Sequence, residues 1–140
     1  MLLAGLGLLA LGSPACSNDG DGAASTTAPS AEVTEDPAER LYGTWDVSAV
    51  RSYHTWEPDG TWYVAAATGG DPYDFGTYTV DGSIVTLNTE ADSPECPGTT
   101  GNWEVTFIDA DTISWEVIDD ECASRGLNVP QTLWERVEAE

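Results

Sequence analysis

The side chains that can do chemistry are few, and they form no recognised catalytic pattern. The chain has one histidine, His54. A general base also needs a nucleophile or an acid partner, which the spacing around His54 does not supply. The motifs GxSxG and HExxH, the phosphate-binding loop and the glycine-rich dinucleotide loop are all missing from the sequence. We therefore expect no enzyme and no cofactor, and we interpret His54 as a polar residue at a strand edge.

Carboxylates are the most abundant ionisable groups. The sequence has 25 Asp and Glu against 4 Lys and Arg, with a formal net charge of -21. Such a surface repels nucleic acid and anionic lipid headgroups. Oxygen-rich loops can bind Ca²⁺, but no EF-hand spacing is present, and a local concentration of carboxylates is expected by chance at this acidity. We predict no metal site among the acidic residues of the later loops, which are Asp92, Glu95, Asp119, Asp120 and Glu121.

The N-terminal segment indicates export. Residues 1–15 are almost wholly apolar, end in small residues and are too short to span a bilayer, which is typical of a signal peptide. The small residues before Cys16 resemble the processing site of a bacterial lipoprotein. That resemblance implies that Cys16 is the lipid anchor and that the protein lies on the extracytoplasmic face of the cell membrane. The alternative is an ordinary signal peptide cut nearby, which leaves Cys16 free.

The pairing of the other two cysteines can be predicted once Cys16 is assigned to the lipid. The chain has three cysteines. With Cys16 assigned to the lipid, Cys96 and Cys122 are an even pair in an oxidising compartment, so a disulfide is predicted. Residues 16–40 are rich in Ser, Thr, Ala, Gly, Asp and Pro and contain no aromatic residue. We predict that they are a lipidated, disordered acidic tether.

Residues 41–138 are predicted to form one all-β domain. Aromatic and β-branched residues alternate with polar ones at period two, and no segment has a convincing helical period. The strand candidates are 43–50, 53–57, 61–67, 75–80, 83–89, 102–108, 112–118 and 131–137.

The connections between these strands alternate in length. Asp- and Gly-rich tight turns are expected at 58–60, 81–82 and 109–111, and longer loops at 68–74, 90–101 and 119–130. Alternate connections of an antiparallel meander lie at the same end. The sequence therefore predicts a small eight-stranded antiparallel up-and-down β-barrel with a closed end and an open mouth. Both Cys96 and Cys122 fall in mouth loops.

Two further residues indicate barrel closure. Trp45 lies in the first strand and Arg136 in the last, and closure would place the guanidinium on the indole. Gly43, Thr44 and Trp45, together with Arg136, resemble the GxW motif and its capping basic residue in lipocalin-like (calycin) proteins. The chain looks more like the small lipocalin-like domains of bacterial lipoproteins than like the larger lipocalins. The resemblance implies a small apolar ligand in the barrel.

The residues expected to face inward allow two interpretations. They form either an aromatic ligand pocket or a packed core, since eight strands leave an interior that side chains can just fill. We expect an exported, membrane-anchored and monomeric protein that binds a small apolar ligand. The alternative is a solid barrel that acts as an interaction or structural module of the cell envelope. The candidate pocket residues are Val47, Val64, Tyr78, Val85, Trp103, Val105 and Trp115.

Overall fold

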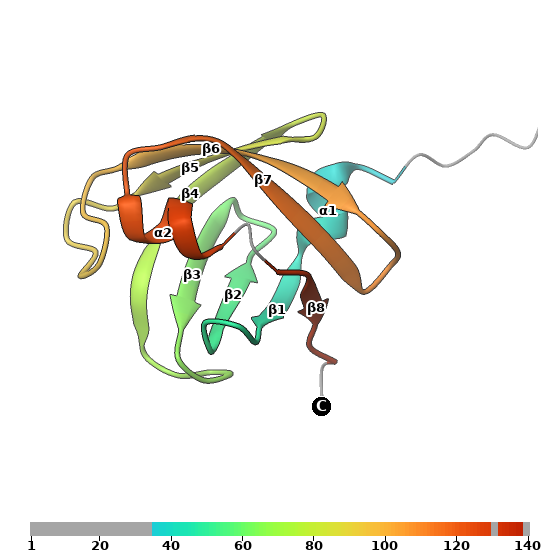
Figure 1. Ribbon diagram of the computed structural model, residues 1–140, viewed down its shortest axis with the longest axis horizontal. Helices are drawn as coiled ribbons and strands as arrows, with labels where there is room; N and C mark the ends of the chain where they lie inside the picture. The colour runs from blue at the N-terminus through green and yellow to red at the C-terminus, as the bar shows by residue number, and fades with distance from the viewer. Residues whose placement is uncertain (1–34, 130–131, 139–140) are drawn as a thin grey trace, which may run out of the picture. The chain divides into compact units, whose positions relative to one another are not determined.

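Consecutive antiparallel strands close into a barrel in which the last strand pairs with the first (Figure 1). The computed structural model describes residues 35–129 and 132–138. This confirms the predicted eight-stranded up-and-down barrel. The strands are β1 (Gly43–Val47), β2 (Ser52–Trp56), β3 (Thr61–Ala65), β4 (Pro72–Asp81), β5 (Ile84–Thr89), β6 (Thr100–Phe107), β7 (Thr112–Asp120) and β8 (Trp134–Arg136).

The strand ends differ from the prediction where turns or long loops begin. β1 ends at Val47 instead of residue 50, because the chain turns there and Val50 N donates to Val47 O at 3.0 Å. Arg51 completes this turn with a positive φ of 55°. β8 is shorter than the predicted 131–137, and β4 is longer than the predicted 75–80.

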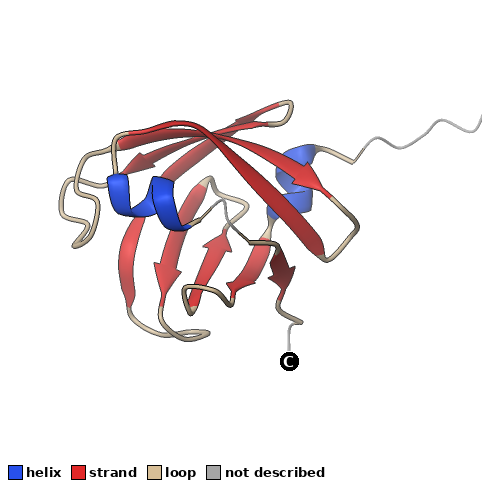
Figure 2. Cartoon of the chain, in the orientation of Figure 1, coloured by secondary structure: helices blue, strands red, loops and turns tan. Residues whose placement is uncertain are grey.

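Two short helices, α1 (Pro37–Leu41) and α2 (Ala123–Asn128), were not predicted (Figure 2). Asp36 starts α1 by accepting a hydrogen bond from Ala38 N at 2.9 Å. Residues 37–40, assigned to the tether from sequence, form most of this helix. In the part of the chain that the structure describes, neither helix is long and apolar enough to cross a bilayer.

The two ends of the barrel differ as the connection lengths predicted. The tight turns β2–β3, β4–β5 and β6–β7 lie at one end with α1, and the long connections and α2 lie at the other (Figure 1). Asp59 fixes the β2–β3 turn by accepting bonds from both Thr61 N, at 2.9 Å, and Thr61 Oγ1, at 2.6 Å. We call the second end the mouth.

Tryptophans fill the barrel. All six are buried, with exposed fractions between 0% and 5%. The Trp56 and Trp115 rings stack with centroids 5.7 Å apart, and Trp103 meets Trp115 edge-on at 5.6 Å. Aromatic side chains bury roughly 150–250 Å² each, so these rings supply much of the hydrophobic free energy of this small domain.

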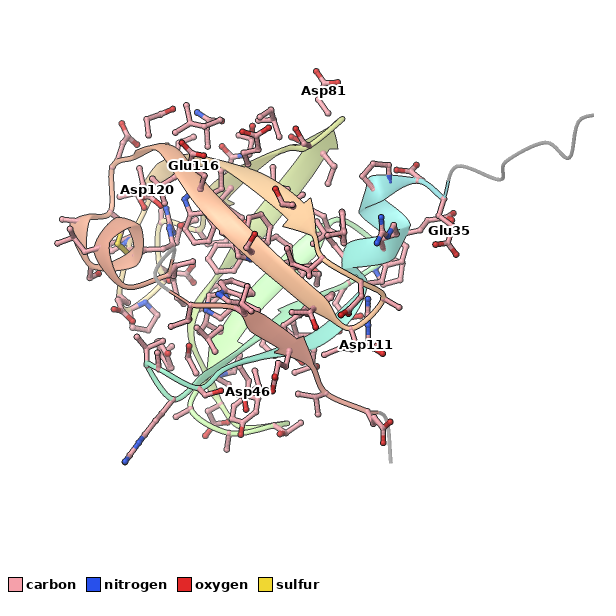
Figure 3. The ribbon with its side chains drawn as sticks, turned by 45° about the vertical axis from the view of Figure 1, so that its right-hand side comes forward. Glu35, Asp46, Asp81, Asp111, Glu116 and Asp120 are labelled. Carbon is pink, nitrogen blue, oxygen red and sulfur yellow. A yellow bond between two sulfur atoms is a disulfide. The ribbon has the colours of Figure 1, made fainter. Side chains whose placement is uncertain are left out.

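Carboxylates cover the outside of the barrel. Asp81, Asp111 and Glu116 are exposed and point away from the core (Figure 3). Glu104 lies directly opposite Glu116 on the β6–β7 pair. Like charges facing each other across strands are destabilising, so this surface favours solubility at some cost to stability.

Candidate functional site

A pocket of about 180 Å³ opens at the mouth, which we call the mouth pocket. β2, β3 and β4 supply its inner wall, and α2 and the mouth loops supply its rim. The lining mixes apolar and polar side chains. They are Val50, Ser52, His54, Val64, Tyr73, Asp74, Glu95, Ser124, Arg125 and Val129.

Arg125 is the buried cation of this pocket, with 5% of its surface exposed. It comes from α2 and points into the barrel. Its Nε and Nη2 donate to the two oxygens of Asp120 at 2.8 and 2.9 Å, which makes a two-bond ion pair. Nη1 donates to Thr89 Oγ1 at 2.6 Å and to Asp74 Oδ2 at 3.4 Å. Nη2 also donates to Thr99 Oγ1 at 3.3 Å, so all five N–H groups are used.

Asp120 is held on several sides. Besides Arg125, its carboxylate accepts bonds from Trp103 Nε1 and Cys122 N, each at 2.8 Å. The side chain lies beside α2 (Figure 3). Gly101 makes room for it, because a Cβ built there would lie 2.6 Å from Asp120 Oδ2. A glycine on β6 is thus needed for the position of Asp120 and, through it, of Arg125.

Asp74 provides the second carboxylate, from the start of β4. It is 3% exposed. Its Oδ1 accepts a 2.6 Å bond from Ser93 Oγ in the β5–β6 loop. Among the described residues, its Oδ2 has only the 3.4 Å contact with Arg125 Nη1. Asp74 therefore links three mouth elements while keeping one oxygen weakly engaged.

The prediction that His54 lies at a strand edge was wrong. His54 is in the middle of β2, only 4% exposed, with its ring centroid 4.3 Å from that of Trp134. Burial, and secondarily the Arg125 charge, lowers the pKa of His54 to about 3. The imidazole is therefore neutral at pH 7. In residues 35–129 and 132–138, nothing donates a hydrogen bond to it or accepts one from it.

Ser52 and Tyr73 add hydroxyl groups to the lining. Ser52 is 3% exposed, and its Oγ has no hydrogen-bond partner of acceptable geometry among the described residues. It is near enough to the Tyr73 hydroxyl to oppose the rise in the pKa of Tyr73 that burial causes. A buried hydroxyl without a firm partner costs about 1–3 kcal/mol. The Ser52 hydroxyl is therefore available to form a hydrogen bond with a ligand.

The candidate pocket residues predicted from sequence are mostly core residues. All are buried, from 0% for Trp103 to 6% for Tyr78, and they pack in one hydrophobic cluster. Val64 is the member of that set that lines the mouth pocket. The others, Val47, Tyr78, Val85, Trp103, Val105 and Trp115, pack within the cluster.

The predicted closure contact is present. The Arg136 guanidinium carbon lies 4.2 Å from the centroid of the Trp45 ring. Arg136 also donates to the carbonyls of Tyr42 and Arg40, at 2.6 and 2.7 Å. A Cβ on Gly43, whose φ is 108°, would come within 3.2 Å of Arg136 Nη1. These residues thus close the barrel and cap the end of α1.

The predicted disulfide is confirmed, because Cys96 and Cys122 are bonded. It joins the β5–β6 loop, which supplies Glu95 to the pocket, to the residue before α2, which supplies Arg125. A loop of this length suggests about 3 kcal/mol of stabilisation by chain entropy. The segment predicted to be a signal peptide, Cys16 and most of the predicted tether lie outside the described residues.

Other regions of the described structure offer less for a ligand. In the described part of the chain, no group of three or more His, Cys, Asp or Glu side chains is placed to hold a metal ion. A hollow of about 520 Å³ lies at the closed end, between α1 and the β6–β7 turn. Its Arg40 lies over Phe107 at 3.9 Å, and its Arg136 is used in barrel closure. The mouth pocket is the better candidate because its polar groups are buried.

Sequence reasoning missed Arg125, Asp74 and Ser52 and misplaced His54. The one available signal was that Arg125 is one of only 4 basic residues in the chain. Comparison of the chain with protein-family models, with curated proteins and with solved structures found no match.

Proposed function

We propose that this protein is an exported, membrane-anchored, monomeric lipocalin-like protein that binds a small ligand in the mouth pocket. The observation that carries the proposal is the pocket itself. Its polar side has the neutral His54 ring and the buried Ser52 hydroxyl, which lies near the Tyr73 hydroxyl but makes no hydrogen bond of good geometry among the described residues. Its other side is apolar. Pockets with a few convergent polar groups on an apolar wall are typical of ligand sites.

Export and anchoring are supported by the apolar N-terminal segment and by Cys16. The Cys96–Cys122 bond agrees with an oxidising compartment. The proposed role is binding without catalysis, since the pocket offers a neutral histidine but no nucleophile paired with it. The membrane is contacted through the lipid on Cys16.

The filled core supports a second candidate, a solid barrel that serves as an interaction or structural module of the envelope. Tryptophans occupy the barrel centre, so a large ligand has no room there. The mouth pocket is also smaller than the roughly 300–1,000 Å³ of sites for drug-sized molecules. A ligand must therefore be small if the first candidate is correct.

A blocking substitution separates the two candidates. Val50 lines the pocket and is 39% exposed, so Val50→Trp should fill the entrance with little effect on folding. Ile118→Trp, at a 55% exposed position on β7, is the matched control. Native mass spectrometry of the exported protein should show a small bound molecule in the wild type and in Ile118→Trp, but not in Val50→Trp. Equal ligand content in all three proteins would contradict a ligand site in the mouth pocket.

A further inference from the structure

The arginine of the mouth pocket has no hydrogen bond to give to a bound anion. All five N–H groups of Arg125 donate to protein oxygens, and the two-bond pair with Asp120 neutralises its charge. Arginine often marks a site for carboxylate or phosphate groups. Here an anionic ligand would have to break buried internal bonds, which is costly.

The pocket instead has carboxylate oxygens that can accept further hydrogen bonds. Asp74 Oδ2 is buried and has only the 3.4 Å contact with Arg125. Glu95 places a second carboxylate at the rim, and no residue of the described ranges donates a hydrogen bond to it. With Arg125 and Asp120 neutralising each other, Asp74 and Glu95 leave the lining with a negative formal charge. This balance favours a cationic ligand.

Apart from Arg125, the described residues of the pocket lining supply no positive group to meet these carboxylates. The neutral His54 contributes no competing charge, and the sequence contains no lysine. The Ser52 hydroxyl can accept a further hydrogen bond. An ammonium group, which has three donors and no acceptor, matches this set of oxygens.

The apolar side of the pocket and the pocket volume limit the polarity and the size of the rest of the ligand. Val64 and Val129 are buried there, and Val50 lies at the entrance. The volume of about 180 Å³ is slightly above the roughly 150 Å³ of an engineered cavity that holds benzene. We propose that the mouth pocket binds a small protonated amine with an apolar body about the size of one aromatic ring. The proposal rests on the proposed function, since it names the ligand class of the same pocket.

Three probes of similar size test the class: benzylamine, benzyl alcohol and benzoate. Each is titrated into purified protein with the disulfide formed, by calorimetry and by amide chemical shifts at Ser52, His54 and Asp74. We expect benzylamine to bind about tenfold more tightly than benzyl alcohol, and benzoate to bind most weakly. If benzyl alcohol or benzoate equals benzylamine, the amine proposal is overturned but small-ligand binding stands. If none of the three binds, both proposals are overturned.

A variant that removes the charge of Glu95 tests whether this carboxylate contributes to amine binding. Glu95→Gln should weaken benzylamine binding about three- to tenfold and leave benzyl alcohol binding unchanged. Glu90→Gln is the matched control, because Glu90 is exposed in the same loop and does not line the pocket. It should change neither affinity. Equal weakening by both variants would mean that benzylamine responds to overall charge and not to this pocket, which would overturn the proposal.

Discussion

The guanidinium of Arg136 lies 4.2 Å from the ring centre of Trp45, and the two residues pair directly across β1 and β8. This contact joins the first strand to the last. The same guanidinium holds the carbonyls of Arg40 and Tyr42. The Arg136 side chain therefore joins β1 to β8 and also holds the end of α1 against the barrel.

Replacing Arg136 should destabilise the domain. Arg136→Ala removes the stacking and two charged hydrogen bonds, so we expect the free energy of unfolding to fall by about 2–3 kcal/mol. Arg136→Lys should be intermediate, because an ammonium lacks the planar face. Urea denaturation measures both. Trp45→Phe should reduce the effect of Arg136→Ala in a double-mutant cycle, and strict additivity would contradict the contact.

Removing the buried cation of the mouth should cost more. Arg125→Met leaves the Asp120 and Asp74 carboxylates buried without their partner, so we expect a loss of about 3–5 kcal/mol. Arg51→Met is the matched control, because Arg51 is exposed. It should change stability by less than about 0.5 kcal/mol. Equal urea midpoints for the two variants would contradict the role given to Arg125.

The low pKa of His54 predicts a loss of stability in acid. The pKa of His54 is about 3 in the folded protein, against 6.5 for an ordinary histidine, so the unfolded chain takes up the proton more readily. The free energy of unfolding should therefore be unaffected above about pH 6.5 and fall by up to about 1.4 kcal/mol per pH unit below it, down to about pH 3.

His54→Gln isolates this effect from the titration of the carboxylates. Glutamine does not titrate, so the variant should lose that part of the slope between about pH 6 and about pH 4. Thermal or urea unfolding at several pH values measures the difference. Identical slopes in the two proteins would show that the pKa of His54 is the same in the folded and unfolded chains, which would contradict its burial as a neutral group.

Cys16→Ser tests the proposed lipid anchor. We expect the wild type in the membrane fraction, with a mass that includes the acyl groups, and the variant in the soluble fraction with its fold unchanged. The circular dichroism spectrum of the variant checks the fold. A wild-type protein that is soluble and carries no lipid would contradict the anchor.

Period-two alternation and turn composition sufficed to predict the barrel. Strands of five or more residues leave a visible pattern, and the Cys96–Cys122 and Trp45–Arg136 pairs followed from topology and from the lipoprotein and lipocalin-like resemblances. The helices were missed because α1 and α2 are five and six residues long, too short to display a helical period.

The residues of the mouth pocket could not be predicted from the sequence for a different reason. Arg125 lies far along the chain from its partner Asp74, and only the closed barrel brings the two side chains together. His54 was interpreted as a polar residue at a strand edge, because the sequence around it supplies no catalytic partner. In this protein it faces the Trp134 ring. Buried polar groups of this kind oppose the alternation rule, and such exceptions are common at functional sites.

A crystal structure of the exported protein, purified without any added ligand, tests the proposed ligand site most directly. We expect electron density for one small molecule in the mouth pocket, within hydrogen-bond distance of Ser52 Oγ or Asp74 Oδ2 and against Val64. A mouth pocket closed by its own side chains, or one that holds only ordered water, would contradict it.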